Sequence, residues 1–241
     1  MKKKFLVAVL AIVPAAACFA EDSSDSWSGE AELGFTRSTG NTDSENLLSR
    51  IKINKEYLKW SNELRLEAIN SSEDDVRTKE SYLMELQANR KFSDLTYAFS
   101  NLRHVEDKFG GFRKQSSVSF GMGWNVLREP DHKLKLESGL GYRRSEEQST
   151  EDMPGETQGE PVFVGSAEWV YQLTETTTLS DTFRTEVGSD NTFTENEIAA
   201  RVKINASLGL KVSYLVRNNS DVPVDTEKTD TLTSISLDYK F

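Results

Sequence analysis

Apolar and polar residues alternate one by one along most of the chain after residue 26. In the segment 231–241, the apolar residues Ile235, Leu237, Tyr239 and Phe241 fall at every second position, with polar residues between them. Successive side chains of a β-strand point to opposite faces, so this segment predicts a strand with one apolar and one polar face. An edge strand of a soluble sandwich would show the same pattern once. Here the pattern recurs in about twelve segments.

The segments that connect these predicted strands differ in length in a regular way. Short turns alternate with longer polar segments at residues 38–43, 70–79, 106–113, 145–160, 188–196 and 218–230. Outer-membrane barrels have an even number of strands, short periplasmic turns and longer outer loops. The pattern therefore predicts an all-β fold: a closed antiparallel up-and-down transmembrane β-barrel of about 12 strands, with both termini in the periplasm.

Aromatic residues support the same fold. All four tryptophans lie at strand ends that are predicted to be periplasmic: Trp27, Trp60, Trp124 and Trp169. Barrels in a bilayer carry such aromatic rings at the membrane interfaces, whereas a soluble core would bury tryptophan in mid-strand. In the fifth predicted strand, the pattern indicates that Leu95, Tyr97 and Phe99 face outward.

The first 20 residues predict a secretory signal peptide. Three lysines at positions 2–4 precede a short apolar core and a run of small residues that ends at Ala20. The predicted organisation is a signal peptide at 1–20, a periplasmic lead-in at 21–26 and the barrel at 27–241. In the alternative, Cys18 is the lipid-modified residue of a periplasmic lipoprotein. Cys18 is the sole cysteine, so cleavage after Ala20 leaves no thiol chemistry.

Composition excludes several classes of protein. The formal net charge is −10, which disfavours nucleic-acid binding because that requires a basic surface. After residue 20 no apolar run is long enough for a spanning helix, but barrel strands conceal their hydrophobicity by alternation. The expected partners are outer-membrane lipid, lipopolysaccharide and the barrel-assembly machinery. That machinery would recognise an assembly signal formed by Ile235, Leu237, Tyr239 and Phe241. The sequence does not predict an oligomeric state.

The inward faces of the predicted strands carry charges of both signs. These candidates for the lining of the lumen are Glu30, Glu32, Arg50, Lys52, Glu63, Arg65, Glu67, Glu85, Lys135, Glu137, Arg143, Glu168, Arg184, Glu186, Arg201, Lys203, Lys211 and Arg217. Two hypotheses follow: a pore whose charged residues select small ionic solutes, or a lumen filled by its own ion pairs. A twelve-stranded barrel lies between the filled and the open sizes. The inward glycines Gly121 and Gly123 are expected to leave space for bulky neighbours.

Catalytic chemistry has few candidates. The two histidines are His104 and His132, and His132 is expected to be solvated beside a turn. His104 shares a strand face with Ser100, but the two would lie ~13 Å apart along the strand. No metal-ligand spacing and no cofactor motif is found, so neither an enzyme nor a cofactor is expected. A barrel enzyme that acts on lipid stays as the alternative. The acidic segment 145–160 is expected to be a solvated loop rather than a divalent-cation site.

Five short segments carry a family resemblance: 34–43 (GFTRSTGNTD), 108–113 (KFGGFR), 139–143 (GLGYR), 228–231 (KTDT) and 237–241 (LDYKF). In this order and spacing, they resemble the domain of unknown function 481 family, the YdiY-like group of salt-induced outer membrane proteins. The resemblance implies an outer-membrane barrel that responds to stress, with no established activity and no catalytic residues. The expected function is therefore non-enzymatic: envelope maintenance, or narrow passage of small polar or ionic solutes under osmotic or acid stress.

Overall fold

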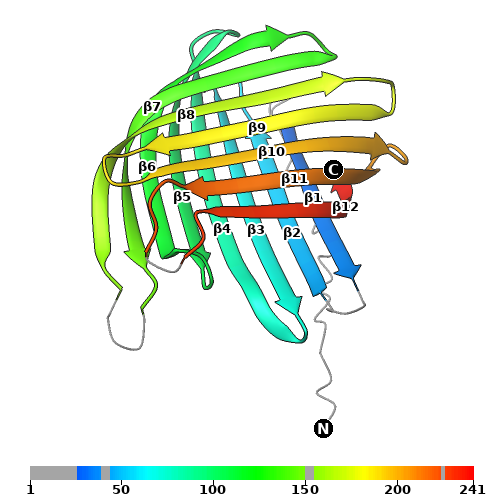
Figure 1. Ribbon diagram of the computed structural model, residues 1–241. Helices are drawn as coiled ribbons and strands as arrows, with labels where there is room; N and C mark the ends of the chain where they lie inside the picture. Colours follow the sequence, from blue (N-terminus) through cyan, green and yellow to red (C-terminus); the bar gives the residue numbers. More distant parts are fainter. Residues whose placement is uncertain (1–25, 39–43, 150–154, 224–225) are drawn as a thin grey trace.

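The computed structural model describes residues 26–38, 44–149, 155–223 and 226–241. They form one closed antiparallel barrel of twelve strands, in which each strand pairs with its neighbours in sequence and β1 pairs with β12 (Figure 1). This confirms the predicted fold class. The described residues contain no helix that is long and apolar enough to cross a membrane. The predicted signal peptide, with Cys18, lies outside the described residues.

The strands are long, and most connections between them are short. Their bounds are β1 Ser26–Ser38, β2 Ser44–Glu56, β3 Trp60–Glu73, β4 Val76–Lys91, β5 Thr96–Asp107, β6 Phe112–Arg128, β7 His132–Glu147, β8 Thr157–Gln172, β9 Thr177–Val187, β10 Thr192–Lys203, β11 Leu208–Asn219 and β12 Thr229–Lys240. We call the end of the barrel that carries the start of β1 and the end of β12 the termini end. The opposite end, which carries the β11–β12 connection, is called the far end.

Closure of the barrel depends on the seam between β1 and β12. Their register runs from Glu30 opposite Lys240 to Gly34 opposite Ser236. Beyond it, Gly29 and Phe241 exchange two backbone hydrogen bonds, of 2.8 and 3.0 Å. The Phe241 ring lies directly over Gly29, where a β-carbon would come within 2.3 Å of the ring. The seam therefore closes the barrel at the termini end, whereas residues 229–235 of β12 have no register partner on β1.

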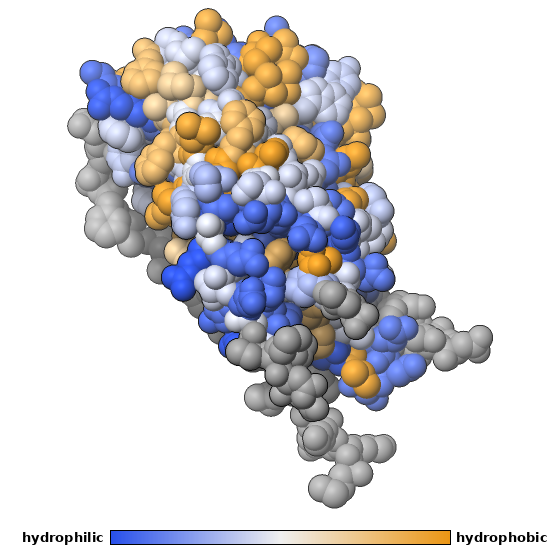
Figure 2. Space-filling model, turned by 60° about the vertical axis from the view of Figure 1, so that its left-hand side comes forward, coloured by the Kyte–Doolittle hydropathy of each residue, from blue (hydrophilic) through white to orange (hydrophobic). Residues whose placement is uncertain are grey.

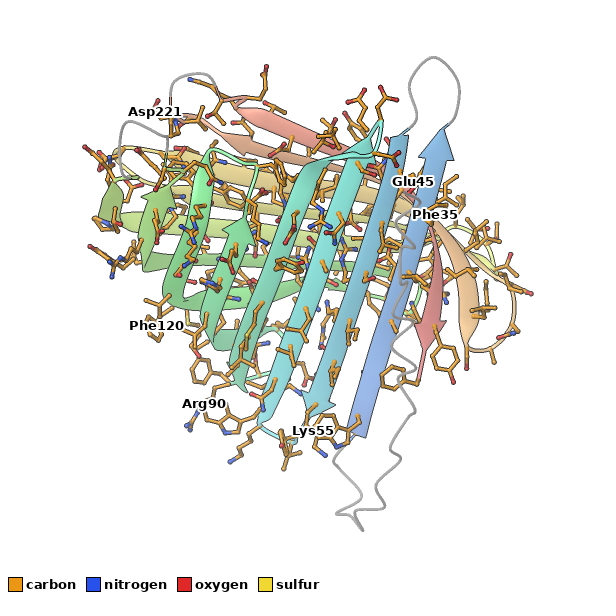
Figure 3. All side chains as sticks on the ribbon, turned by 90° about the horizontal axis from the view of Figure 1, so that it is seen from below. Phe35, Glu45, Lys55, Arg90, Phe120 and Asp221 are labelled. Carbon is orange, nitrogen blue, oxygen red and sulfur yellow. The ribbon has the colours of Figure 1, made fainter. Side chains whose placement is uncertain are left out.

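Large apolar side chains cover the exterior. Leu33, Phe120 and Ile235 are 60 %, 61 % and 51 % exposed, and Phe35 and Phe120 point away from the barrel in Figure 3. In the space-filling view, hydrophobic residues gather on one part of the visible face (Figure 2). Soluble monomers rarely expose so much contiguous apolar surface, whereas an outward apolar belt is expected of a barrel that faces lipid.

Aromatic and basic side chains meet at the termini end. The Lys55 ammonium lies 4.9 Å from the Trp27 ring and 5.2 Å from the Tyr57 ring, and the Arg90 guanidinium lies 5.5 Å from the Trp60 ring. Lys55 and Arg90 are labelled at this end in Figure 3. Such pairs place an apolar ring toward the hydrocarbon and a charge toward water. This arrangement is the interfacial ring that the tryptophan positions predicted.

The prediction of a long loop at 70–79 is wrong. Strands β3 and β4 continue through most of it, and only Asp74 and Asp75 connect them. Both residues have positive φ angles, 46° and 62°, as the two central residues of a type I′ hairpin turn require. The segment is polar on both faces because it extends beyond the apolar belt. Its composition is that of a loop, although its backbone pairs as a strand.

Replacing Asp75 with glycine is expected to stabilise this hairpin by roughly 0.5–1 kcal/mol, because glycine adopts a positive φ without steric cost. Urea unfolding of the detergent-refolded protein measures the change. Asp221→Gly is the matched control, since Asp221 is an exposed loop aspartate whose φ is not positive. Equal effects of the two substitutions would contradict this explanation.

The expected outward positions of Tyr97 and Phe99 are also wrong. Both rings face the lumen and are buried, with 7 % and 4 % exposed. Gly121 and Gly123 on β6 make the space: a β-carbon at 121 would lie 2.7 Å from the Phe99 ring, and one at 123 would lie 2.2 Å from the Tyr97 ring. The Tyr97 hydroxyl donates a hydrogen bond to Glu137 (2.9 Å). The glycines therefore accommodate bulky neighbours, as expected.

Candidate functional site

A polar cavity of about 1250 Å³ occupies the lumen on the side of the termini end. Turn residues Lys59 and Asp94 line its mouth, and Arg50 and Glu195 line its depth. Thirteen of the eighteen predicted lumen residues contribute to its wall: Glu30, Glu32, Arg50, Lys52, Glu63, Arg65, Glu85, Lys135, Glu137, Glu168, Arg184, Arg201 and Lys211. We call this cavity the vestibule.

The other five predicted lumen residues do not line the vestibule. Glu67, Arg143, Glu186 and Arg217 lie deeper among hydrogen-bonded side chains, and Lys203 is exposed at the end of β10. The sequence prediction also missed several charged residues that the barrel buries, among them Arg103, Glu160, Glu195, Glu197 and Asp238. Arg103 was missed because the two faces of β5 were interchanged. Glu195 fell in a segment that was predicted to be a loop.

Glu67 is the first centre of an ion-pair network in the middle of the lumen. Its carboxylate accepts hydrogen bonds from Arg50 (2.8 Å), Arg65 (3.0 Å) and Arg217 (2.6 Å). Only 1 % of its side chain is exposed. Hydrogen bonds between arginine and carboxylate are short and strong, and a buried charge requires such partners. The network therefore fixes the positions of three long side chains at once.

Glu195 is the second centre. It accepts hydrogen bonds from Arg217 (2.6 Å), Arg103 (3.2 Å) and Arg65 (3.4 Å). These arginines belong to β11, β5 and β3. Because Arg65 and Arg217 contact both carboxylates, the two centres form one connected set. We call this set, with Arg50, Glu85, Arg184 and Glu197, the cross-lumen layer.

The layer joins opposite walls of the barrel. In the closed order of strands, β10 is five positions from β3 in one direction and five from β5 in the other, yet Glu195 on β10 pairs with Arg65 and Arg103 on those strands. Arg184 on β9 reaches Glu85 on β4, also five positions away, at 3.4 Å. Side chains from opposite walls therefore meet in the middle of the lumen.

Apolar residues pack next to the cross-lumen layer. Leu48, Ile69 and Leu215 form a buried cluster, against which Leu232 also packs. Leu48 lies two residues from Arg50 on β2, and Ile69 lies two residues from Glu67 on β3, in both cases on the side of the far end. Their burial excludes water from one side of the ion pairs, which strengthens the electrostatic interactions.

Loop contacts cover the far end of the lumen. Gly111 is buried, and a β-carbon there would lie 3.1 Å from Val222. Gly111 precedes β6 and Val222 follows β11, so the two loops belong to distant strands of the barrel. Lys79 on β4 pairs with Asp107 (2.9 Å) and with Asp230 on β12 (3.1 Å). These contacts join Val222 and Asp230, which flank the β11–β12 connection, to the loop before β6 and to β4.

The β9–β10 connection is held by a buried arginine. Arg143 donates hydrogen bonds to the Glu160 carboxylate (2.6 Å) and to the backbone carbonyl oxygens of Glu186 and Asn191. Glu160 also accepts a hydrogen bond from the backbone N–H of Asp190 (2.8 Å). In the connection between β5 and β6, the hydrogen bond that Lys108 donates to Glu80 raises the pKa of this loop lysine. Arg143 is thus a structural residue of the far end.

The histidines have partners that the sequence did not predict. His104 lies on the outward face of β5 and its Nδ1 is 2.8 Å from the Ser116 hydroxyl on β6, a serine partner that the sequence analysis did not identify. His132 is not simply solvated: its Nε2 accepts a hydrogen bond from the Trp169 indole (2.9 Å). Within the described part of the chain, no group of three or more potential ligands is placed to hold a metal ion.

Comparison with known proteins places this barrel in a family. The chain is 29 % identical over 217 residues to the uncharacterized protein YdiY of Escherichia coli (strain K12). The aligned region covers 88 % of this chain and 82 % of YdiY. Among solved structures, it is similar to an outer membrane channel from Pseudomonas putida F1, with a TM-score of 0.50, 8 % identity and coverage of 95 % and 100 %.

It is also similar to the NanC porin, with a TM-score of 0.48, 13 % identity and coverage of 88 % and 97 %. At 8 % identity, the similarity to the Pseudomonas putida channel supports the fold alone. The family model described as "Protein of unknown function, DUF481" matches residues 31–241. Because this match extends over nearly the whole barrel, the chain belongs to the DUF481 family.

Proposed function

We propose that the protein is a bacterial outer-membrane barrel whose lumen is non-enzymatic and admits only small polar or ionic solutes, and that the cross-lumen layer closes this lumen at rest. The termini end, with its aromatic and basic ring, faces the periplasm in this proposal. The vestibule is then open to the periplasm. Lipopolysaccharide surrounds the far end, and the barrel-assembly machinery inserts the chain.

The contacts of Glu195 carry the proposal. One carboxylate pairs with arginines from strands on two opposite sides of the barrel, so it obstructs the path from the vestibule to the far end. A wide channel would instead keep its charged residues on the wall and leave the axis to water. The mixed charges of the vestibule suit small ions and zwitterions of either sign.

Passage under osmotic or acid stress follows from the same contacts. Salt screens exposed ion pairs far more than buried ones, so it acts on the partly exposed pairs beside the layer, such as Lys52–Glu63, whereas acid neutralises the carboxylates that hold the arginines. Acid therefore weakens the cross-lumen layer itself, and salt weakens the ion pairs that border it, in both cases without a change of fold. A barrel that only maintains the envelope would hold the same layer closed under all of these conditions.

Planar-bilayer recording tests the closed lumen. The wild-type protein is expected to show little steady conductance, whereas Glu195→Ala is expected to raise the conductance several-fold, because it removes the shared carboxylate and vacates its volume. Glu129→Ala, in an exposed turn, is the control and should match the wild type. Steady, porin-like conductance of the wild type would refute the closed lumen, and an unchanged Glu195→Ala conductance would refute the layer as the barrier.

A further inference from the structure

A serine and a histidine form a hydrogen-bonded pair on the lipid-facing side of the barrel, outside the lumen. The Nδ1 atom of His104 lies 2.8 Å from the Ser116 Oγ. The two residues are direct cross-strand partners in the β5–β6 register, and both are exposed. A serine hydroxyl within hydrogen-bond reach of a histidine is the minimal arrangement for nucleophilic attack on an ester.

An apolar groove of about 400 Å³ reaches His104 of this pair, and Glu106 also contributes to its lining. It crosses the outward faces of β2 to β5, and its lining includes Ile51, Leu66, Ala68, Met84 and His104. Met84 stands directly opposite His104 in the β4–β5 register. Carbon-rich walls of this kind bind apolar chains. An acyl chain that lies in the groove would have its ester end beside His104.

Cationic side chains flank the pair on its other side. Arg144 on β7 stands directly opposite Ser116, and Lys114, two residues before Ser116 on the same face of β6, stands between Glu106 on β5 and Glu146 on β7. Tyr142, two residues before Arg144 on that face, is 52 % exposed and suits a membrane interface. Lipid phosphates and acyl esters lie at the membrane interface, so the two cations are at the height in the bilayer where a lipid phosphate would be found.

We propose that Ser116 and His104 hydrolyse an acyl ester of a phosphorylated lipid in the outer leaflet. The Ser116 Oγ attacks the ester carbonyl carbon while its proton passes to Nδ1 of His104. The C–O bond to the lipid alcohol then breaks, and the alcohol leaves with that proton. Water attacks the acyl-serine in the same way, which releases the fatty acid and restores the serine. Arg144 and Lys114 bind the lipid phosphate. This activity is separate from passage through the lumen.

Labelling and hydrolysis assays on the full-length barrel in detergent micelles test the proposal. A fluorophosphonate probe is expected to label Ser116, as located by mass spectrometry. Phosphatidylethanolamine and lipid A, each supplied alone, identify the lipid by the fatty acid released. Ser116→Ala and His104→Ala are each expected to lower the rate by about 100-fold or more. Ser100→Ala is the matched control, since Ser100 shares the outward face of β5 with His104 and is not its partner.

Heat-modifiable migration on gels shows which variants are folded. The combined variant Lys114→Gln with Arg144→Gln should raise KM for the phosphorylated lipid and leave kcat nearly unchanged. A folded wild-type protein that neither takes the probe nor releases fatty acid from either lipid overturns the proposal, and so does hydrolysis that survives in Ser116→Ala. The conductance of the lumen tests the proposed function separately and does not affect the result of these labelling and hydrolysis assays.

Discussion

Replacing Glu67 with glutamine is expected to lower the free energy of unfolding by about 3–5 kcal/mol, because it leaves buried arginines without their shared countercharge. Arg50, Arg65 and Arg217 all donate to this carboxylate. Glutamine has nearly the same volume, so the loss reports charge and not packing. Urea titration of the detergent-refolded protein, followed by tryptophan fluorescence, measures it.

Glu63→Gln is the matched control on the same strand. Its carboxylate is 34 % exposed and pairs with Lys52 at 3.0 Å, and a pair with this access to water contributes roughly 0–1 kcal/mol. We therefore expect the loss of unfolding free energy to be several-fold larger for Glu67→Gln than for Glu63→Gln. Equal losses for Glu63→Gln and Glu67→Gln would show that the cross-lumen layer adds no more to stability than a pair at the wall.

Replacing Gly121 with alanine is expected to prevent most of the protein from forming a closed barrel. The added β-carbon would lie 2.2 Å from the carbonyl oxygen of Ser138 and 2.6 Å from the Cα of Gly139, its register partner on β7. These are backbone atoms, which cannot move without breaking the β6–β7 pairing. The fraction of heat-modifiable protein after refolding measures the effect.

Gly165→Ala is the control for the general cost of replacing a strand glycine. A β-carbon at Gly165 would meet Thr185 at 3.5 Å, which is an ordinary contact. This variant should fold as the wild type does. Similar folding of Gly121→Ala and Gly165→Ala would mean that β6 and β7 can separate locally, and that close approach at Gly121 is not required.

Alternation predicted the exterior well because lipid imposes one simple rule on each strand. Leu33, Phe120 and Ile235 face outward as expected, and the twelve strands close into a barrel. The rule failed in β5, where Tyr97 and Phe99 are as apolar as the residues on the lipid side. Their direction depends on the glycines of the adjacent β6, and alternation within one strand carries no information about its neighbour.

The alternation of apolar and polar residues could not predict the contacts within the site, for a related reason. The sequence showed that Arg65 faces inward, but the partner of that residue depends on which strands lie opposite, and therefore on the closed order of the barrel. The same applies to His104. Its distance to Ser100 follows from strand geometry, whereas the hydrogen bond to Ser116 requires the β5–β6 register.

The two aromatic rings of β5 and the two glycines of β6 also constrain how the family diverges. Each ring occupies the volume that a side chain at its glycine would need, so neither member of a pair can change alone without a collision or a void. Related sequences should therefore exchange both members together at 123 and 97, with a larger residue at position 123 accompanied by a smaller one at 97, whereas position 121 should stay glycine because backbone atoms of β7 also occupy that space. Such correlated substitutions would show that the two positions have stayed in contact inside the barrel during evolution.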